Sequence, residues 1–479
     1  MPSNNLSSKN NNKLRQNSTQ SNQRLAFTIL AVIQTTLIFT IALITIPLPK
    51  IAVEFNLTSA DLLLVLAAYG LPFSGLLLFG GRLADRFQGR RMLAIGLFIF
   101  GISSVIAGFA PSFKILVAMR FAQGVGGALT APAAMAVLRA LFPEQSAFSR
   151  AMVTWGGVSV LGAVLGFVIS GVATTWISWR WMFAVPVVVS IIGLISTRGL
   201  LPAGIDESHQ HRPKLDLVGA ILATFGISLS SYGLILTGDH SWSSSIVLIP
   251  LLTGLGLLLA FAVIERLVRD PLLPPGFILE RYRLTGLFGM FLAAVGSGVI
   301  NFILSLYLQQ ELGWTPLMTA TSFLPFAVAL IAIGQIAPSL VGRLGAARVT
   351  GMGLIISALG FGLLVGIDRN TTYIAGLLPS LVLIAVGISL AFSGAAVLST
   401  MNVPQHQAGL AGGVMNTAME LGPTVGLSAL MAIAATQIDT IDGYIWAFGT
   451  AAVAYTIAAL LTLLFTNRSS AALGKPHHE

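Results

Sequence analysis

The chain has 479 residues, of which 55% are hydrophobic and only 9% are charged. An ordinary soluble domain carries about 25% charged residues, so this composition excludes a mostly water-exposed surface. The absence of cysteine excludes disulfide frameworks, thiolate metal sites and cysteine nucleophiles. The sequence therefore indicates an integral membrane protein.

The first predicted element is a polar tail, residues 1–24, which is rich in Asn and Ser and contains no acid. This composition is typical of disorder. Fourteen apolar runs follow, each close to the roughly 20 residues that a helix needs to cross about 30 Å of hydrocarbon. The predicted spans are 25–48, 62–81, 92–110, 115–138, 151–173, 181–200, 217–237, 246–263, 284–308, 320–341, 349–367, 373–398, 408–433 and 445–465.

The basic residues orient these spans. With a cytoplasmic amino terminus, 21 of the 26 Lys and Arg residues fall in cytoplasmic segments and four fall in outer ones. This positive-inside pattern accounts for the net charge of +9 without a nucleic-acid partner. We expect a multi-pass protein of the cell (inner or plasma) membrane with both termini in the cytoplasm.

Two ionisable residues lie well inside apolar runs. Glu420 follows the start of the thirteenth run by about 18 Å of helix, which places it near the midplane, and Arg120 lies in the fourth run. Buried charge is costly in a bilayer, so both are functional candidates by default. The alternatives, a permanently protonated Glu420 and an Arg120 bonded only to backbone carbonyls, stay open.

Neutral polar residues form stripes on four of the predicted helices. Ser297, Asn301 and Ser305 illustrate the pattern, because their i, i+4 and i+8 spacing shares one helix face. Any one such residue also fits hydrogen bonding between helices, but the four stripes together predict a shared wet cavity. The candidate cavity residues are Gln34, Thr36, Thr40, Gln123, Ser297, Asn301, Ser305, Ser389 and Ser393.

Signals for catalysis are missing from the sequence. No Ser/His/Asp set can lie at one membrane depth, no His pair has metal-ligand spacing, and no GxxxxGK[ST] phosphate loop occurs. We therefore expect no enzyme activity, no catalytic residues, no metal and no cofactor. The protein should use a gradient or no energy source.

The segment from Gly80 to Arg91 resembles the signature loop of the major facilitator superfamily, with Gln88 where glycine is usual and Gly89 one place later. In that family the loop latches the cytoplasmic side, although a basic loop also sets topology. The resemblance assigns gating to Gly81, Asp85, Arg86, Gly89, Arg90 and Arg91.

Two further strings resemble motifs of the drug:proton antiporters of that superfamily. Arg120 to Ala128 matches R-x-x-Q-G-x-G-x-A, whose arginine is implicated in proton handling. Gly162, Gly166 and Gly171 resemble the glycine motif of the fifth helix, with Phe167 in place of its proline. Small residues four apart also serve close packing, which is the role we assign to these glycines.

Together these strings make the chain resemble the fourteen-helix drug:proton antiporter branch over residues 25–466. The resemblance implies an all-α membrane fold of two six-helix bundles plus two inserted helices, and segment 342–348 looks like a decayed second signature loop, as parallel halves predict. The expected parts are a disordered cytoplasmic tail (1–24), an N-terminal bundle (25–200), a linker with the inserted pair (201–283), a C-terminal bundle (284–466) and a cytoplasmic tail (467–479).

The resemblance implies an exporter of amphiphilic organic compounds or drugs that works by proton antiport with alternating access. Thr40 stands where relatives commonly carry an acid, so Glu420 becomes the candidate proton carrier and Arg120 the second candidate for proton coupling. The expected partners are a small amphiphilic substrate, protons and the lipid bilayer, and we expect a monomer. Two alternatives stay open, an uncoupled facilitator or proton symporter of a small metabolite and a non-transporting receptor or scaffold.

Overall fold

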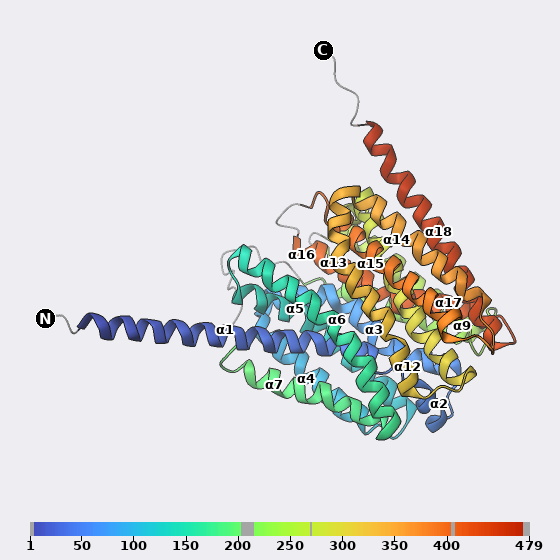
Figure 1. Cartoon of the computed structure of the whole chain (residues 1–479), viewed down its shortest axis with the longest axis horizontal. Coiled ribbons are helices and arrows are strands. Elements are labelled where there is room, and N and C mark those ends of the chain that lie inside the picture. Colours follow the sequence, from blue (N-terminus) through green and yellow to red (C-terminus); the bar gives the residue numbers. More distant parts are fainter. Residues whose placement is uncertain (1–3, 203–214, 269–270, 404–407, 473–479) are drawn as a thin grey trace, which may run out of the picture.

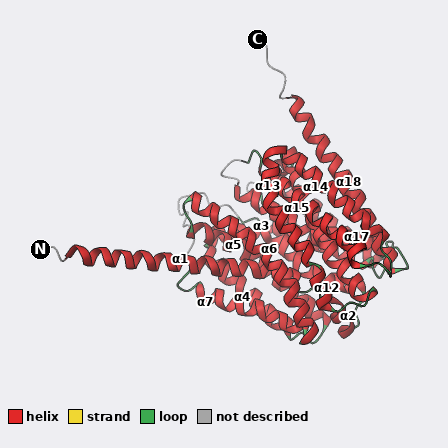
Figure 2. Ribbon diagram, viewed as in Figure 1, coloured by secondary structure: helices red, strands yellow, loops and turns green. Residues whose placement is uncertain are grey.

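The computed structural model of the protein describes residues 4–202, 215–268, 271–403 and 408–472, and within these ranges it is helical and free of strands (Figure 2). Thirteen helices among the described residues are long and apolar enough to cross a membrane, and each coincides with a predicted run. The long helix α6 (Gln145–Trp176) occupies the remaining predicted run. The predicted all-α membrane fold is confirmed.

The first half contains six spans and a short amphipathic helix, α2, between the first two. Its elements in chain order are α1 (Asn4–Ala42), α2 (Leu48–Phe55), α3 (Ser59–Phe87), α4 (Gly89–Gly108), α5 (Phe113–Leu141), α6, the 3-10 turn η1 (Trp179–Phe183) and α7 (Ala184–Ser196). The inserted pair consists of α8 (Leu217–Leu236) and α9 (Ser245–Leu267).

The second half is more broken, because several of its spans contain a π-helical or 3-10 turn. Its elements are α10 (Pro275–Ile278), α11 (Arg281–Val299), η2 (Ile300–Leu304), η3 (Tyr307–Glu311), α12 (Pro316–Ser322), α13 (Leu324–Leu344), α14 (Ala346–Leu363), η4 (Leu364–Gly366), η5 (Tyr373–Leu377), α15 (Leu378–Thr400), α16 (Ala408–Leu421), η7 (Gly422–Gly426), α17 (Leu427–Ala434) and α18 (Thr440–Ala472).

The two ends of the chain differ from the expectation. The structure continues α1 back to Asn4, so the tail predicted as disordered is helical from that residue (Figure 1). Extending an existing helix is far less costly than nucleating one, and the adjacent membrane span supplies the nucleus. Likewise α18 runs to Ala472, past the predicted boundary at 467. The bounds between the parts of the chain remain a prediction.

Acidic side chains cap the first turn of several helices. Thr58 and Asp61 form a capping box at the start of α3, with Thr58 Oγ1 accepting from the Asp61 amide at 3.2 Å and Asp61 Oδ2 accepting from the Thr58 amide at 3.1 Å. Glu280 caps α11 by accepting from the Arg283 amide at 2.9 Å. Such bonds satisfy amides that the first helical turn leaves without partners.

The two halves repeat a close approach of helix backbones. A Cβ added at Gly126 of α5 would lie 2.6 Å from the Phe100 amide nitrogen of α4, and one at Gly353 of α14 would lie 2.3 Å from the Ala391 amide nitrogen of α15. Only glycine fits at such contacts, which are typical of membrane helix pairs.

In Figure 1 the start of α1 lies at the left and the end of α18 at the top, both away from α2 and α12 at the lower right, and we call the side with the start of α1 and the end of α18 the terminal end. The opposite end carries α2 and α12 and is called the α2 end. There the halves meet, because Gln309 Nε2 donates to the Ile46 carbonyl at 3.0 Å and a Cβ at Gly171 would lie 2.6 Å from the Ala320 Cβ. Midway along α3 the halves also touch tightly, since a Cβ at Gly70 would lie 2.3 Å from Cγ2 of Thr424.

Candidate functional site

Arg120 is held by backbone and amide oxygens inside the first half. Its side chain is fully buried, and Nη1 donates to the Thr40 carbonyl at 3.3 Å and to Gln123 Oε1 at 3.2 Å. Gln123 Nε2 in turn donates to Ser104 Oγ at 2.7 Å. Within the described part of the chain, Arg120 forms no ion pair and its Nη2 has no hydrogen-bond partner. The site therefore contains a desolvated positive charge with spare donor capacity.

Tyr69 of α3 connects this charge to the second half. Its ring lies beneath the guanidinium, with Arg120 Cζ 4.9 Å from the ring centroid, and its hydroxyl donates to the Leu37 carbonyl at 3.4 Å. Tyr69 also interacts electrostatically with Glu420 of α16. The next residue along α3, Gly70, packs on Thr424, whose hydroxyl donates to the Glu420 carbonyl at 3.1 Å. Arg120, Tyr69 and Glu420, called the central cluster below, thus span the interface between the halves.

The polar stripe of α1 is largely occupied by its own backbone. Thr36 Oγ1 donates to the Val32 carbonyl at 2.8 Å, and Thr40 Oγ1 donates to the Thr36 carbonyl at 2.7 Å. Gln34 is half-buried. Thr40 therefore contributes its carbonyl, rather than its hydroxyl, to the Arg120 site.

The predicted stripe of α11 is divided by π-helical turns. Ser297 precedes them and is half-buried, Asn301 lies in η2 with an Oδ1 that is buried and without a partner in the described structure, and Ser305 follows. Ser305 Oγ donates to the Thr45 carbonyl at 3.5 Å and accepts from Gln309 Nε2 at 3.1 Å. Ser305 thus belongs to the closed α2 end.

On α15, Ser389 Oγ donates to the Leu330 carbonyl of α13 at 3.1 Å, which is a bond between helices, while Ser393 is half-buried. Of the predicted cavity residues, the structure brings Thr40 and Gln123 into contact with Arg120. The shared wet cavity itself remains a prediction.

The residues assigned to gating lie at the junction of α3 and α4, at the terminal end. Asp85, Arg86 and Arg91 are exposed, and Arg90 Nη1 donates to the Leu201 carbonyl at 3.3 Å. Gly81 and Gly89 both face α5, where a Cβ would lie 3.9 Å from Cβ of Pro132 and 3.0 Å from Cβ of Ala136, respectively. Arg82 donates to the Pro271 carbonyl in the segment that follows α9.

The glycines of α6 lie against other helices. A Cβ at Gly162 would lie 2.6 Å from the Thr35 carbonyl oxygen, and one at Gly166 would lie 2.8 Å from Cβ of Ala42, both on α1. Gly171 instead faces Ala320 of α12, across the two halves. All three positions therefore leave no room for a side chain.

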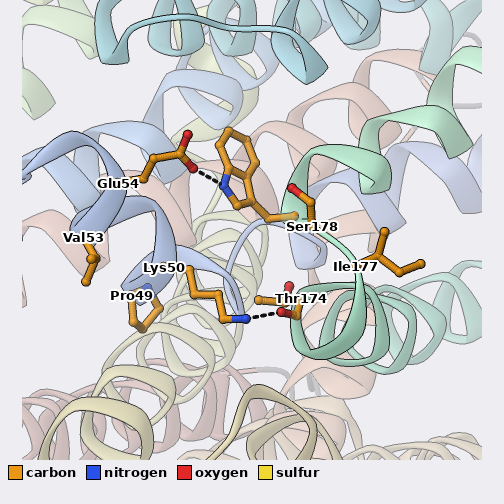
Figure 3. A pocket seen from close by; sticks show the side chains of 8 residues that line it. Pro49, Lys50, Val53, Glu54, Thr174, Ile177 and Ser178 are labelled. Atoms are coloured by element: carbon orange, nitrogen blue, oxygen red, sulfur yellow. Dashed lines mark hydrogen bonds between the residues drawn. The ribbon is translucent and has the colours of Figure 1, made fainter.

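A separate surface pocket of about 490 Å³ lies at the α2 end, between α2 and the end of α6 (Figure 3). Glu54 accepts from Trp179 Nε1 at 2.8 Å on one side of it, and Lys50 donates to the Thr174 carbonyl on the other. Glu54 also forms an ion pair with Arg180 at 2.6 Å. None of the residues predicted for the cavity or for proton coupling lines this pocket.

Sequence reasoning missed Tyr69, Ser104 and Gln309. The available signal was weak: Tyr69 is the only tyrosine of its apolar run, next to Gly70, but a tyrosine in a membrane span is also an ordinary packing residue. Its importance depends on which helix face meets the other half, which the sequence does not specify.

Comparison with known proteins agrees with this architecture. The family model described as Major Facilitator Superfamily matches residues 28–279 and 286–479. The chain is 33% identical to puromycin resistance protein pur8 of Streptomyces alboniger over 87% of this chain and 85% of that protein. It is 35% identical to the cephamycin export protein CmcT of Amycolatopsis lactamdurans, over 83% of this chain and 82% of that protein.

Solved structures show the same fold at lower identity. A peptide transporter, POT, in complex with sulfate superposes with a TM-score of 0.69 at 15% identity, covering 92% of this chain and 94% of that one. The nucleoside transporter NupG gives a TM-score of 0.64 at 15% identity, covering 92% and 99% of the two chains. This protein, with its paired helical halves, belongs to the Major Facilitator Superfamily.

Proposed function

We propose that the protein exports amphiphilic organic compounds of the antibiotic class, in exchange for protons, by alternating access. The names of its relatives support the substrate class, since they include a puromycin resistance protein, a cephamycin export protein and a lincomycin resistance protein. We place the protein in the plasma membrane as a monomer with both termini in the cytoplasm, so that the terminal end faces the cytoplasm. The positive-inside charge pattern supports this orientation.

The central cluster carries the proposal, because it joins an acid of one half to a buried guanidinium of the other through Tyr69. A proton-coupled transporter needs an ionisable group whose charge is felt by both halves. Glu420 meets this need, since it lies near the midplane and interacts with Tyr69. Arg120 is a positioning residue in this scheme, because its guanidinium lies over the ring of Tyr69, which in turn interacts with Glu420.

The coupling follows from electrostatics at low dielectric. When Glu420 loses its proton to the terminal end, its carboxylate is attracted toward Arg120 and the Tyr69 hydroxyl, which draws the two halves together there. When Glu420 is protonated from the α2 end, that attraction disappears and the halves can part differently. Substrate and proton therefore occupy the interface in alternation, and the proton gradient supplies the energy.

The test uses purified protein in liposomes with puromycin and lincomycin as trial substrates and an imposed pH difference. We expect uphill accumulation that a protonophore abolishes. Glu420→Gln, which keeps the side-chain shape but removes the charge, should abolish uphill transport while leaving substrate binding within about threefold of wild type.

The matched control is Glu144→Gln, because Glu144 is an exposed carboxylate at the start of α6. It should transport like wild type. Proton-driven uphill transport in Glu420→Gln would remove Glu420 from the mechanism. Equilibration of substrate without any response to the pH difference would instead identify an uncoupled facilitator, and no flux at all would identify a receptor or scaffold.

A further inference from the structure

A second buried acidic pair lies outside the central cluster, on the inserted helices. Asp216 caps α8 and is 7% exposed, and Glu265 lies near the end of α9 and is 2% exposed. Each carboxylate has one satisfied oxygen: Asp216 Oδ1 accepts from the Gly219 amide at 2.7 Å, and Glu265 Oε2 accepts from the Leu273 amide at 2.8 Å. In each carboxyl group, the backbone amide therefore satisfies one oxygen and leaves the other to be accounted for.

The other two oxygens have no donor among the described residues. These are Asp216 Oδ2 and Glu265 Oε1, and both lie over Gly219, where an added Cβ would be 2.5 Å from the first and 2.6 Å from the second. Because both oxygens lie so close to the same point above Gly219, they are at most about 5 Å apart. Two ionised carboxylates can only accept hydrogen bonds and they repel each other, so burying these two oxygens close together without a donor favours a proton on one of them.

Among the described residues, two arginines lie near the pair. Arg82, from the terminal end of α3, interacts electrostatically with Glu265 and donates to the carbonyl of Pro271, two residues before the Leu273 amide that binds Glu265. Arg266 neighbours Glu265 on α9 but is exposed. Within the described ranges, Arg82 is therefore the cation placed to compensate the pair when it carries two negative charges.

We propose that Asp216 and Glu265 form a second proton-binding site, in which one shared proton bridges the two carboxyl groups and its loss recruits the Arg82 guanidinium as counter-charge. The site is separate from the central cluster, because Arg82 lies about 20 Å beyond Tyr69 along the α3 axis. It lies near the terminal end, beside the end of α3 that carries Arg82, so we expect it to exchange protons with that side.

Loss of the shared proton has a mechanical consequence. A second negative charge attracts Arg82 away from the Pro271 carbonyl, and Arg82 sits on the segment of α3 that precedes the α3–α4 junction. The proton at this site thus controls how the inserted pair is attached to that junction. This consequence for transport rests on the proposed function, whereas proton binding itself does not.

The direct test is infrared titration of the purified full-length protein, which detects the carbonyl stretch of a protonated carboxyl group. We expect wild type to lose a buried carboxyl band as the pH is raised. Glu265→Gln and Asp216→Asn should each lack that band, because an amide supplies the bridging donor without titrating, and either amide retains the backbone caps.

Two controls locate the signal. Glu280→Gln alters another carboxylate that caps a helix but has no acidic neighbour bonded to it among the described residues, so its band should match wild type. Glu420→Gln should also retain the band. An unchanged band in both Asp216→Asn and Glu265→Gln would overturn the proposal, as would a wild type without a titrating buried carboxyl.

Transport in liposomes gives the second readout. Varying the pH on the terminal side should change the exchange rate of wild type, and both amide variants should lose at least half of that pH response while keeping uphill transport. A full pH response in the variants would overturn the gating consequence. Absence of transport in wild type would contradict the proposed function alone, because the infrared band is measured without substrate.

Discussion

Gln88 and Gly345 occupy equivalent places in the two halves: each is the single residue between two membrane helices, and each has a positive φ, 71° and 88° respectively. The segment 342–348 that resembles a decayed signature loop thus has the backbone of the first loop. A positive φ is easily adopted by glycine but is strained for a residue with a side chain. The first half therefore holds strain at the junction that the second half avoids.

Replacing Gln88 by glycine should relieve this strain. We expect Gln88→Gly to raise the free energy of unfolding by about 1 kcal/mol, measured by thermal unfolding in detergent. Gly345→Ala should lower it by a similar amount, whereas Gly342→Ala, where nothing lies within 4 Å of an added Cβ, should have little effect. A destabilised Gln88→Gly variant would show that the Gln88 side chain contributes more than its backbone costs.

Removing the Tyr69 hydroxyl should weaken proton coupling without disturbing the fold. Tyr69→Phe keeps the ring beneath Arg120 but loses the hydroxyl, which donates to the Leu37 carbonyl and interacts electrostatically with Glu420, so we expect proton-driven exchange to fall about tenfold, equivalent to about 1.4 kcal/mol. The measurement is the initial exchange rate in liposomes. Tyr232→Phe on α8, an exposed site, is the control, and equal rates for both variants would exclude the hydroxyl from coupling.

Enlarging Gly171 should open the α2 end. A valine there cannot fit against Ala320, and overpacking of about 1–3 kcal/mol corresponds to a shift of roughly 5- to 150-fold in a conformational equilibrium. Because the chain has no cysteine, Ser305→Cys supplies a unique label at this buried position. A membrane-impermeant maleimide should modify it faster in the Gly171→Val background, but not in Gly256→Val, where an added Cβ meets open space.

The ion pair at the α2 end should contribute little. Glu54 and Arg180 are 2.6 Å apart but partly exposed, so Glu54→Gln should lower the free energy of unfolding by less than about 1 kcal/mol, with the difference shrinking in high salt. The glutamine oxygen can still accept from Trp179 Nε1. Thermal unfolding at two salt concentrations checks this, and a loss that is large and independent of salt would contradict a purely surface role.

Much of the fold could be predicted from the sequence, because a bilayer leaves few ways to satisfy the hydrogen bonds of backbone N–H and C=O groups. Each apolar run had to become a helix, and the signature strings located the halves. The tail before residue 25 was predicted from composition, which describes a segment in isolation, whereas the structure continues α1 from the adjacent span back to Asn4.

The site could be predicted only in part. Arg120 and Gln123 are neighbours on one helix face, so their contact follows from spacing. The stripe through Asn301 assumes a regular α-helix, but the π-helical turn η2 lies between Ser297 and Ser305 and changes the residue register, and Ser305 donates to the Thr45 carbonyl. The position of Tyr69 between Arg120 and Glu420 depends on how the halves dock, which no local pattern encodes.

The contact of Gly70 with Thr424 leaves no space for another atom, so the halves cannot approach more closely there, and a rotation that keeps this contact must turn about it. This contact acts as a pivot between the two stretches of α3 on either side of Gly70. A rotation about it that moves one stretch of α3 away from the second half must move the other stretch toward the second half. The geometry thus opposes a continuous aqueous leak, because the terminal end and the α2 end cannot open at the same time without breaking the contact between Gly70 and Thr424.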